Sequence, residues 1–247
     1  MDNTYNNVTP ITYSTQPLTD VSAMNRCYIV QEDDTVAMSY CCNMKKVYSV
    51  YGDNSEGKVI HLFKVKDNTN KCLKWCVGAD RLPVNIDINT VIVVNGCEER
   101  KTFINMGRLC KNCHHTYVNV DYVENGRSFG TVDQQPCTCA SHTFEVKDEL
   151  DMVRYHVVVM CEQQGFFWRR WCCCAGRPVE FDIYGEEGMG EVVGKIYRKE
   201  RKGCCYSKVE CCYIDFPKEA NAEDKVRLIC AGMLLEHLFF EEDTHTS

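Results

Sequence analysis

The feature that most restricts the fold of this chain is an apolar run near its C-terminus, Val226–Phe240, which only three polar residues interrupt. Asn221, followed by Asp224 three residues later, predicts a helix N-cap, so a helix is expected over about residues 222–241. A helix that is apolar on nearly every face must be buried all round. The run spans roughly 22 Å against roughly 30 Å of hydrocarbon in a bilayer, which favours burial inside the protein over a membrane span.

Short runs rich in β-branched and aromatic residues, separated by turn residues, fill most of the chain before this helix. The expected strands are Tyr28–Val30, Lys46–Tyr51, Val59–Val65, Val84–Val94, Tyr117–Val123, Thr143–Val146, Met152–Cys161, Phe166–Trp171, Val179–Tyr184, Glu191–Tyr197 and Cys204–Ile214. So many short strands without intervening helices indicate a mostly β fold, either a sandwich or a barrel. The polar residues 1–22 lack periodicity and are expected to form a disordered leader, followed by one domain over residues 23–247.

Two segments of the chain resemble each other at a spacing of about 95 residues. Trp75–Ile88 and Trp171–Ile183 both contain a Trp-Cys pair and then an Arg close to Pro-Val, and both continue into an alternating strand. Two copies suit two pseudo-equivalent halves of one closed barrel. Chance similarity between two cysteine-rich β segments is the alternative.

Cysteine is the outlying residue type, with 19 in 247 residues. The count is odd, several cysteines are adjacent, and the chain begins without the basic and apolar regions of a secretory signal. Neighbouring cysteines seldom bridge each other. We therefore expect a reduced, intracellular protein whose thiols are core residues, metal ligands or acylation sites. The net charge of −7 argues against a general nucleic-acid binder.

The C-terminal third of the chain resembles the signature of a known family. Cys212–Pro217, an acidic linker, and Val226–Glu241 resemble the Gly-Ile-Gln-Phe-Pro segment and the hydrophobic helix ending Phe-Phe-Glu of the phospholipid scramblases. Val193–Ile196 is similar to the family's Val-Gly-Lys-Ile strand, and Cys72–Pro83 is similar to its cysteine-rich turn. The resemblance covers roughly residues 28–241, in order and with few gaps.

This resemblance implies a Tubby-like fold, which is a closed barrel of about twelve strands with a buried hydrophobic C-terminal helix. It also implies calcium-linked, ATP-independent movement of phospholipids in both directions between membrane leaflets, at the cytoplasmic face of the plasma membrane. No covalent bond changes in this activity. The chain has no nucleotide-binding loop, metalloprotease motif or nucleophile elbow, so it is not expected to be an enzyme.

Two functional segments of the family fall on this chain in reduced form. The acylation cluster falls on Leu109–His114, and the calcium segment falls on Lys208–Cys211, where a lysine replaces the first carboxylate. Glu210 and Asp215 remain as calcium ligands at a degenerate site, because a calcium ion requires six to eight oxygen ligands. The residues expected to carry S-palmitoyl groups are Cys110 and Cys113, with Cys172, Cys173 and Cys174 as further lipidation candidates.

Other ligands are open as alternatives for the cysteine and histidine residues. Seven of them lie close enough in the sequence to supply tetrahedral zinc ligands, although their spacing is not that of a paired zinc knuckle. They are Cys110, Cys113, His114, His115, Cys137, Cys139 and His142. Cys110–His114 also matches the attachment pattern of a c-type haem, which would require an export signal. Acylated or buried cysteines are favoured over both.

One local positive cluster stands out in this acidic chain. Residues 195–208 contain six basic side chains and a single carboxylate. The basic residues proposed as a patch are Lys195, Arg198, Lys199, Arg201 and Lys202. Such a patch suits anionic lipid headgroups or nuclear import, and a solvated hairpin is the alternative. Phe166–Ala175, with its aromatic residues, two arginines and three thiols, is either a membrane-interface patch or a barrel strand.

The sequence therefore predicts a scramblase-like protein whose partners are membrane phospholipids. Because a helix of about fifteen residues provides no polar path through the bilayer, lipid movement would require homo-oligomers or local bilayer thinning. The alternative is a lipid-tethered, non-catalytic adaptor that binds protein partners and has a nuclear pool.

Overall fold

The structure is a computed structural model. The described residues are 12–14, 16–32, 46–53, 58–68, 85–94, 97–112, 115–122, 126–136, 141–160, 180–188, 190–202 and 208–236.

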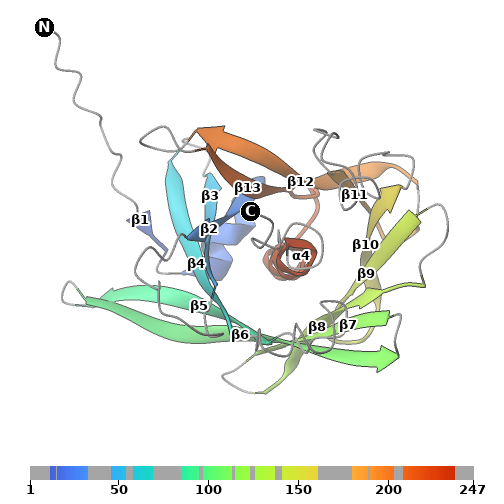
Figure 1. The fold of residues 1–247 in the computed structure, drawn as a ribbon, viewed down its shortest axis with the longest axis horizontal. Coiled ribbons are helices and arrows are strands. Elements are labelled where there is room, and N and C mark those ends of the chain that lie inside the picture. Colours follow the sequence, from blue (N-terminus) through green and yellow to red (C-terminus); the bar gives the residue numbers. More distant parts are fainter. Residues whose placement is uncertain are drawn as a thin grey trace, which may run out of the picture.

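Twelve antiparallel strands form a closed barrel, in which each strand pairs with the strands before and after it in the chain (Figure 1). The last strand, β13, pairs with the first, β2, and closes the ring. The strands are β2 Arg26–Glu32, β3 Val47–Asp53, β4 Val59–Asp67, β5 Asn85–Val94, β6 Cys97–Asn112, β7 His115–Tyr122, β8 Ser128–Gln134, β9 Ser141–Lys147, β10 Val153–Met160, β11 Glu180–Tyr184, β12 Val192–Lys202 and β13 Lys208–Asp215.

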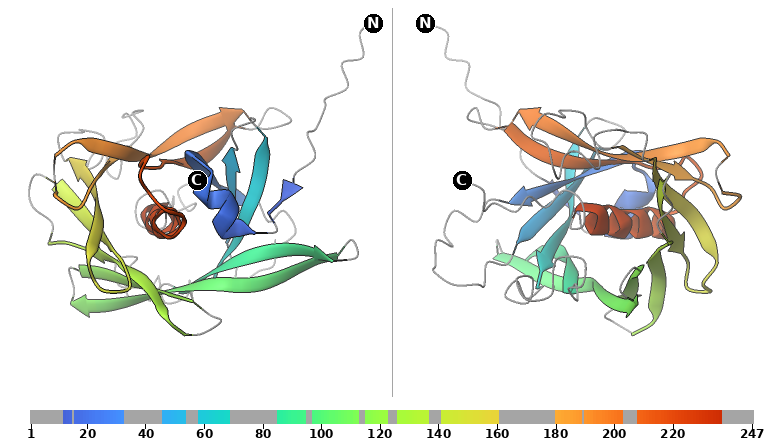
Figure 2. Two further views of the ribbon diagram at one scale, coloured as in Figure 1. Left: turned by 180° about the vertical axis from the view of Figure 1, so that it is seen from behind. Right: turned by 45° about the vertical axis from the view of Figure 1, so that its right-hand side comes forward.

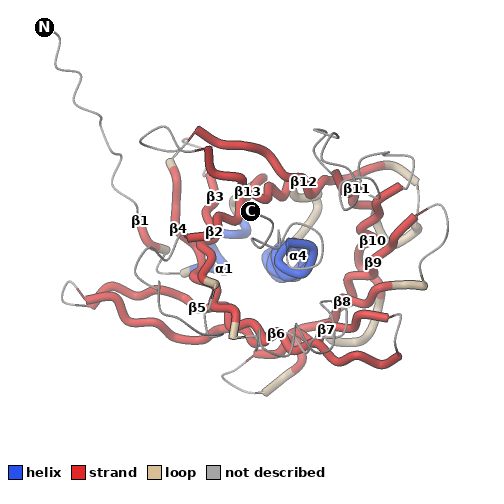
Figure 3. Tube along the Cα trace, in the orientation of Figure 1, coloured by secondary structure: helices blue, strands red, loops and turns tan. Residues whose placement is uncertain are grey.

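Helix α4, Ala222–Leu235, occupies the centre of this ring (Figure 3) and runs between its two ends (Figure 2). Asn221 caps the helix, since its side-chain oxygen accepts a hydrogen bond of 2.8 Å from the backbone N–H of Asp224. Every residue from Asp224 to Leu235 is buried. The predicted closed barrel of about twelve strands with a buried C-terminal helix is confirmed. The predicted end of the helix at residue 241 lies outside the described residues.

The two similar sequence segments lead into strands on opposite sides of the barrel. β5 and β11 are separated by six positions in an order of twelve strands. Ile86 and Ile88 of β5 are buried in the core, as are Phe181 and Ile183 of β11, which lie 95 residues later. The alternating apolar residues that the two sequence segments share are therefore the residues of β5 and β11 that face the core.

Part of the predicted leader is structured, which corrects the expectation of a disordered segment over residues 1–22. β1, Thr12–Tyr13, pairs in parallel with β4, and α1, Pro17–Ser22, packs against α4 with Val21 buried. The ammonium group of Lys225 in α4 donates hydrogen bonds of 2.7 and 2.8 Å to the backbone carbonyls of Ser22 and Met24. This polar segment, with one buried valine, is ordered because α4, which is distant in sequence, packs against it and donates hydrogen bonds to its backbone carbonyls.

Two strands of the barrel, β6 and β8, were missed by the strand prediction. β6 begins with four charged residues after Cys97, and β8 contains glycine and polar residues, so neither has the composition of an ordinary strand. The predicted strand Phe166–Trp171 lies outside the described residues. Pairing with neighbouring strands, rather than local propensity, determines β6 and β8.

Ion pairs and a cation–π contact fix α4 to one side of the barrel. The Arg227 side chain donates to the backbone carbonyl of Phe129 at 2.8 Å, to Asp224 at 2.9 Å and to Glu149 at 2.7 Å, and its guanidinium lies 4.7 Å from the centre of the Phe129 ring. Gly130 makes this approach possible. Its φ is +146°, and a Cβ there would lie 2.2 Å from a backbone oxygen and 3.1 Å from Nε of Arg227.

Candidate functional site

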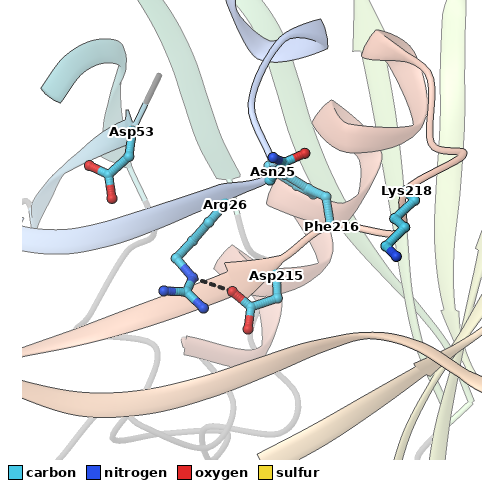
Figure 4. A pocket seen from close by; sticks show the side chains of 6 residues that line it. All are labelled: Asn25, Arg26, Asp53, Asp215, Phe216 and Lys218. Carbon is cyan, nitrogen blue, oxygen red and sulfur yellow. Dashed lines mark hydrogen bonds and ion pairs between the residues drawn. The ribbon is translucent and has the colours of Figure 1, made fainter. Parts of the chain in front are cut away.

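A surface cavity of about 750 Å³ lies where β13 ends and β2 begins (Figure 4). Its lining residues are Asn25, Arg26, Asp53, Asp215, Phe216 and Lys218. Arg26 and Asp215 are directly paired across the strands and hydrogen-bonded through Nε and a carboxylate oxygen. This bond raises the pKa of the Arg26 guanidinium, against the opposing effect of burial. The cavity thus contains Asp215, one of the two predicted calcium ligands, and the carboxylate of Asp215 is already paired with the Arg26 guanidinium.

The other predicted calcium ligand is not brought to this cavity. Glu210 and Asp215 both belong to β13, where Glu210 pairs with Glu200 and Asp215 pairs with Lys195. Five residues along a strand separate their Cα atoms by roughly 16 Å, and two positions an odd number apart lie on opposite faces of a strand. A calcium ion binds its oxygen ligands at about 2.3–2.6 Å, so these two residues do not share one ion.

The predicted basic patch is divided by the structure into residues with different surroundings. Lys195 forms ion pairs with Glu180 at 3.2 Å and with Asp182 at 3.6 Å, which raise its pKa. Arg198 has a side chain only 15% exposed and lies 3.7 Å from Glu236 at the C-terminal end of α4. Lys199 is exposed to solvent. Only part of the predicted patch is therefore an available positive surface.

The remaining two basic residues of the patch lie at the end of β12. Arg201 pairs in backbone register with Val209, and Lys202 pairs with Lys208 of β13. These pairs place three basic positions of the sequence at the adjoining ends of two neighbouring strands.

The predicted lipidation sites are only partly described. Cys110 lies on β6, paired with Thr116 of β7, close to the end of that strand. Cys113 and Cys172–Cys174 lie outside the described residues. Their acylation stays a prediction.

Four cysteines of the described chain are free and buried, which separates them from the candidate acylation sites. They are Cys27, Cys211, Cys212 and Cys230. Burial raises the pKa of the Cys27 and Cys212 thiols, and it raises that of Cys230 to about 12. A thiolate is the form that attacks acyl donors and binds metals, so Cys27, Cys212 and Cys230 act as small core side chains.

The zinc alternative concerns residues at the ends of three strands. Cys110 and His115 lie on β6 and β7, and His142 lies on β9 with its pKa lowered by burial. The other four proposed ligands, Cys113, His114, Cys137 and Cys139, lie outside the described residues. Among the described side chains, no group of three or more His, Cys, Asp or Glu residues could hold a metal ion.

The cavity at Asp215 includes a residue that the sequence did not mark as functional. Arg26 and Asp215 are 189 residues apart, and only closure of the barrel makes β2 and β13 neighbours. Because two basic and two acidic side chains line the cavity, its chemistry is that of ion pairing.

Comparisons with known proteins leave the family of the chain unassigned. No family model matches the sequence, and no curated protein matches it. Among solved structures, a porin-like protein from Bacteroides uniformis aligns over 83% of this chain and 98% of its own, with 9% identity and a TM-score of 0.19. A likeness at this level carries no inference about fold or function. In the described part of the chain, no helix is long and apolar enough to cross a membrane.

Proposed function

We propose that the protein is a phospholipid scramblase-like protein of the cytoplasmic face of the plasma membrane, which moves phospholipids between leaflets without ATP and in a calcium-linked manner. One observation carries the proposal. Cys212–Pro217, which resembles the scramblase signature, ends the strand that closes the barrel, and α4 then fills its centre. This is the arrangement that the sequence resemblance implies. A fold alone does not determine a function, so the proposal also rests on the resemblance itself.

The proposed activity changes no covalent bond, and the lipids would move along the outside of the barrel. Leu228, Ile229 and Leu234 of α4 are buried against the inward-facing side chains of the strands, so the centre of the barrel is filled. Lipids would therefore move along the outer surface of the protein, at a place where oligomers or local thinning of the bilayer shorten the path. S-palmitoyl groups at the candidate cysteines would hold the barrel at the membrane.

A specific observation favours the second candidate function, a lipid-tethered adaptor. Asp215 is paired with Arg26, and Glu210 is too far along β13 to bind the same ion. Any calcium dependence of lipid movement would then require other ligands. An adaptor would need no calcium site, and its cavity of mixed charge would bind a polar group of a protein partner.

Leaflet exchange of fluorescent phospholipids in vesicles, with purified full-length protein and with or without calcium, tests the proposal. Exchange faster than in protein-free vesicles, without ATP and increased by calcium, is the expected result. A Glu210→Ala/Asp215→Ala variant is the matched control, and because these residues are separated on β13 we expect it to keep the calcium response. Absence of exchange at every calcium concentration, from protein with a cooperative thermal transition, would contradict the proposal and favour the adaptor.

A further inference from the structure

Large apolar side chains are exposed at one part of the described surface. The described part of the chain has four of them, and all lie at the end of the barrel where α4 begins, in or beside two neighbouring turns. They are Leu150 and Met152 between β9 and β10, and Val192 and Val193 at the start of β12. We call these four residues the apolar rim. Exposed apolar residues that gather in one place mark an interaction surface, whereas scattered ones need no explanation.

The turn between β9 and β10 fixes the backbone of its two apolar residues. The side chain of Asp148 accepts hydrogen bonds from the backbone N–H groups of Leu150 at 2.9 Å and Met152 at 3.0 Å. Asp151, between them, has a φ of +62° and donates its backbone N–H to the carbonyl of Asp148 at 3.1 Å. These bonds do not depend on apolar side chains at residues 150 and 152, yet the two are 77% and 62% exposed. Because their backbone is already ordered, a partner that binds them pays less in lost conformational freedom.

A β-bulge exposes two successive residues at the start of β12. Side chains along a strand normally alternate between its two faces. Here Val192 pairs with Tyr184 and Gly194 pairs with Ile183, so Val193 is an extra residue between two paired positions. Both valines are 39% exposed. The bulge thus adds a second apolar side chain where a regular strand would present one.

The two parts of the apolar rim are close enough for one partner to contact both. β9 to β12 follow one another around the barrel (Figure 1), and β11 alone separates β10 from β12. Neighbouring strands lie about 4.8 Å apart, so roughly 10 Å separates β10 from β12. Arg154 of β10 forms an ion pair with Glu186 in the turn between β11 and β12, which connects the two turns. An α-helix with its side chains is about 10–12 Å wide, so a single helix can contact both parts.

Negative charge is in excess around the apolar rim. Residues 147–154 and 185–193 contain six Asp or Glu residues and two cations, Lys147 and Arg154. Lys147 forms ion pairs with three carboxylates and Arg154 with two, so neither is available as a positive charge to a partner. Glu187 and Glu191, in contrast, are exposed and form no ion pair within the described part of the chain.

This charge distinguishes between the possible occupants of the apolar rim. An anionic membrane surface would be repelled by the carboxylates. A second copy of the chain, docked through the same face, would bring like charges together. A protein segment with Lys or Arg beside apolar residues is complementary to both the carboxylates and the exposed apolar side chains.

We propose that the apolar rim is a docking surface for a basic amphipathic helix of a protein partner. Leu150, Met152, Val192 and Val193 contact the apolar side of that helix. Glu187 and Glu191 pair with the lysine or arginine residues that flank it. The inference goes beyond the proposed function and does not depend on it, because this surface needs neither calcium nor lipid.

Fluorescence anisotropy with a labelled peptide of leucine and lysine residues at amphipathic helical spacing tests the surface, with full-length protein at physiological ionic strength. We expect this peptide to bind, and a peptide with glutamate in place of every lysine not to bind. Leu150→Gln/Met152→Gln should weaken binding roughly ten-fold or more, because burying two apolar side chains contributes at least that factor. Glu187→Gln/Glu191→Gln should weaken it roughly five-fold.

The matched control for the charge is Asp53→Asn/Asp121→Asn. It removes two carboxylates at the same end of the barrel, on β3 and β7, which do not adjoin the apolar rim. Charges farther away than about 8 Å are largely screened at this ionic strength, so the control should change affinity by less than about two-fold. All variants should melt cooperatively like the parent protein.

Several results would overturn the inference. Absence of peptide binding, binding that Leu150→Gln/Met152→Gln leaves unchanged, or an equal loss in the control would each show that the apolar rim is not the docking surface. Sedimentation with phosphatidylcholine vesicles that this variant abolishes would assign the rim to a bilayer instead. Self-association that it abolishes, measured by analytical ultracentrifugation, would assign the rim to a second copy. Peptide binding and leaflet exchange are separate measurements, so either proposal can fail while the other holds.

Discussion

Buried thiols distinguish two classes of cysteine at the scale of single residues. Burial raises the pKa of the Cys27, Cys212 and Cys230 thiols, so they stay protonated near neutral pH. We expect these three residues to resist iodoacetamide in the native protein and to react fully once it is denatured. Mass spectrometry of labelled peptides measures both states. Native labelling as fast as in an unfolded peptide would contradict their assignment to the core.

At Gly232, α4 lies close to β13 of the barrel. A Cβ at this position would lie 2.6 Å from Cδ1 of Ile214 on β13, which is shorter than any ordinary contact. A Gly232→Arg variant would bury a long cationic side chain in the same space, so we expect it not to fold. Solubility and a circular dichroism melt provide the measurement.

The control for this variant is Glu219→Arg, which introduces the same residue at an exposed position just before α4. It should melt within a few degrees of the parent protein. A soluble Gly232→Arg protein with a cooperative melt near that of the control would mean that α4 does not lie inside the barrel.

At the scale of elements, Arg227 holds α4 against the strands. Its side chain is 4% exposed, whereas that of Arg127 is 66% exposed, and both pair with Glu149. Arg227→Met would leave Asp224 buried with a weaker partner, Arg154 at 3.8 Å. Since breaking a buried ion pair typically costs about 3–5 kcal/mol, urea unfolding should show a loss of that size for Arg227→Met and less than about 1 kcal/mol for Arg127→Met. Equal losses would contradict the role of Arg227 as an anchor.

The elements also show what one sequence can and cannot predict. The N-cap at Asn221 and the all-apolar helix after it were predictable, because both are local patterns. The separation of Glu210 and Asp215 could also have been inferred, since their five-residue spacing on a strand is visible in the sequence. Pairs such as Arg26 with Asp215 depend on strand register and barrel closure, which no single segment encodes.

The neutralisation of the Lys195 charge by ion pairs also depends on contacts between strands. A run of basic residues predicts a patch only if no acidic residue faces it, and Glu180 and Asp182 come from the neighbouring strand β11. The ordering of α1 likewise depends on Lys225, about 200 residues away, which donates hydrogen bonds to backbone carbonyls at the end of the α1 segment. Long-range partners thus decide both whether a charged cluster is available and whether a polar segment is ordered.

At the scale of the whole molecule, we expect the proposed acylation sites to hold the barrel at a membrane. One acyl chain gives only marginal binding, and stable attachment needs two signals. Cys110 and Cys113 lie within three residues of each other at one end of β6, and Cys97 lies at the opposite end of that strand. In cells that acylate the protein, Cys110→Ala/Cys113→Ala should therefore shift it from the membrane fraction to the soluble fraction.

Cys97→Ala is the matched control for this shift, because it removes a thiol from the same strand at the end that carries no predicted acylation site. Fractionation, together with hydroxylamine-sensitive labelling of thioesters, measures location and acylation in one sample. We expect the control to keep both. Unchanged partitioning of the double variant would remove these two cysteines as anchors.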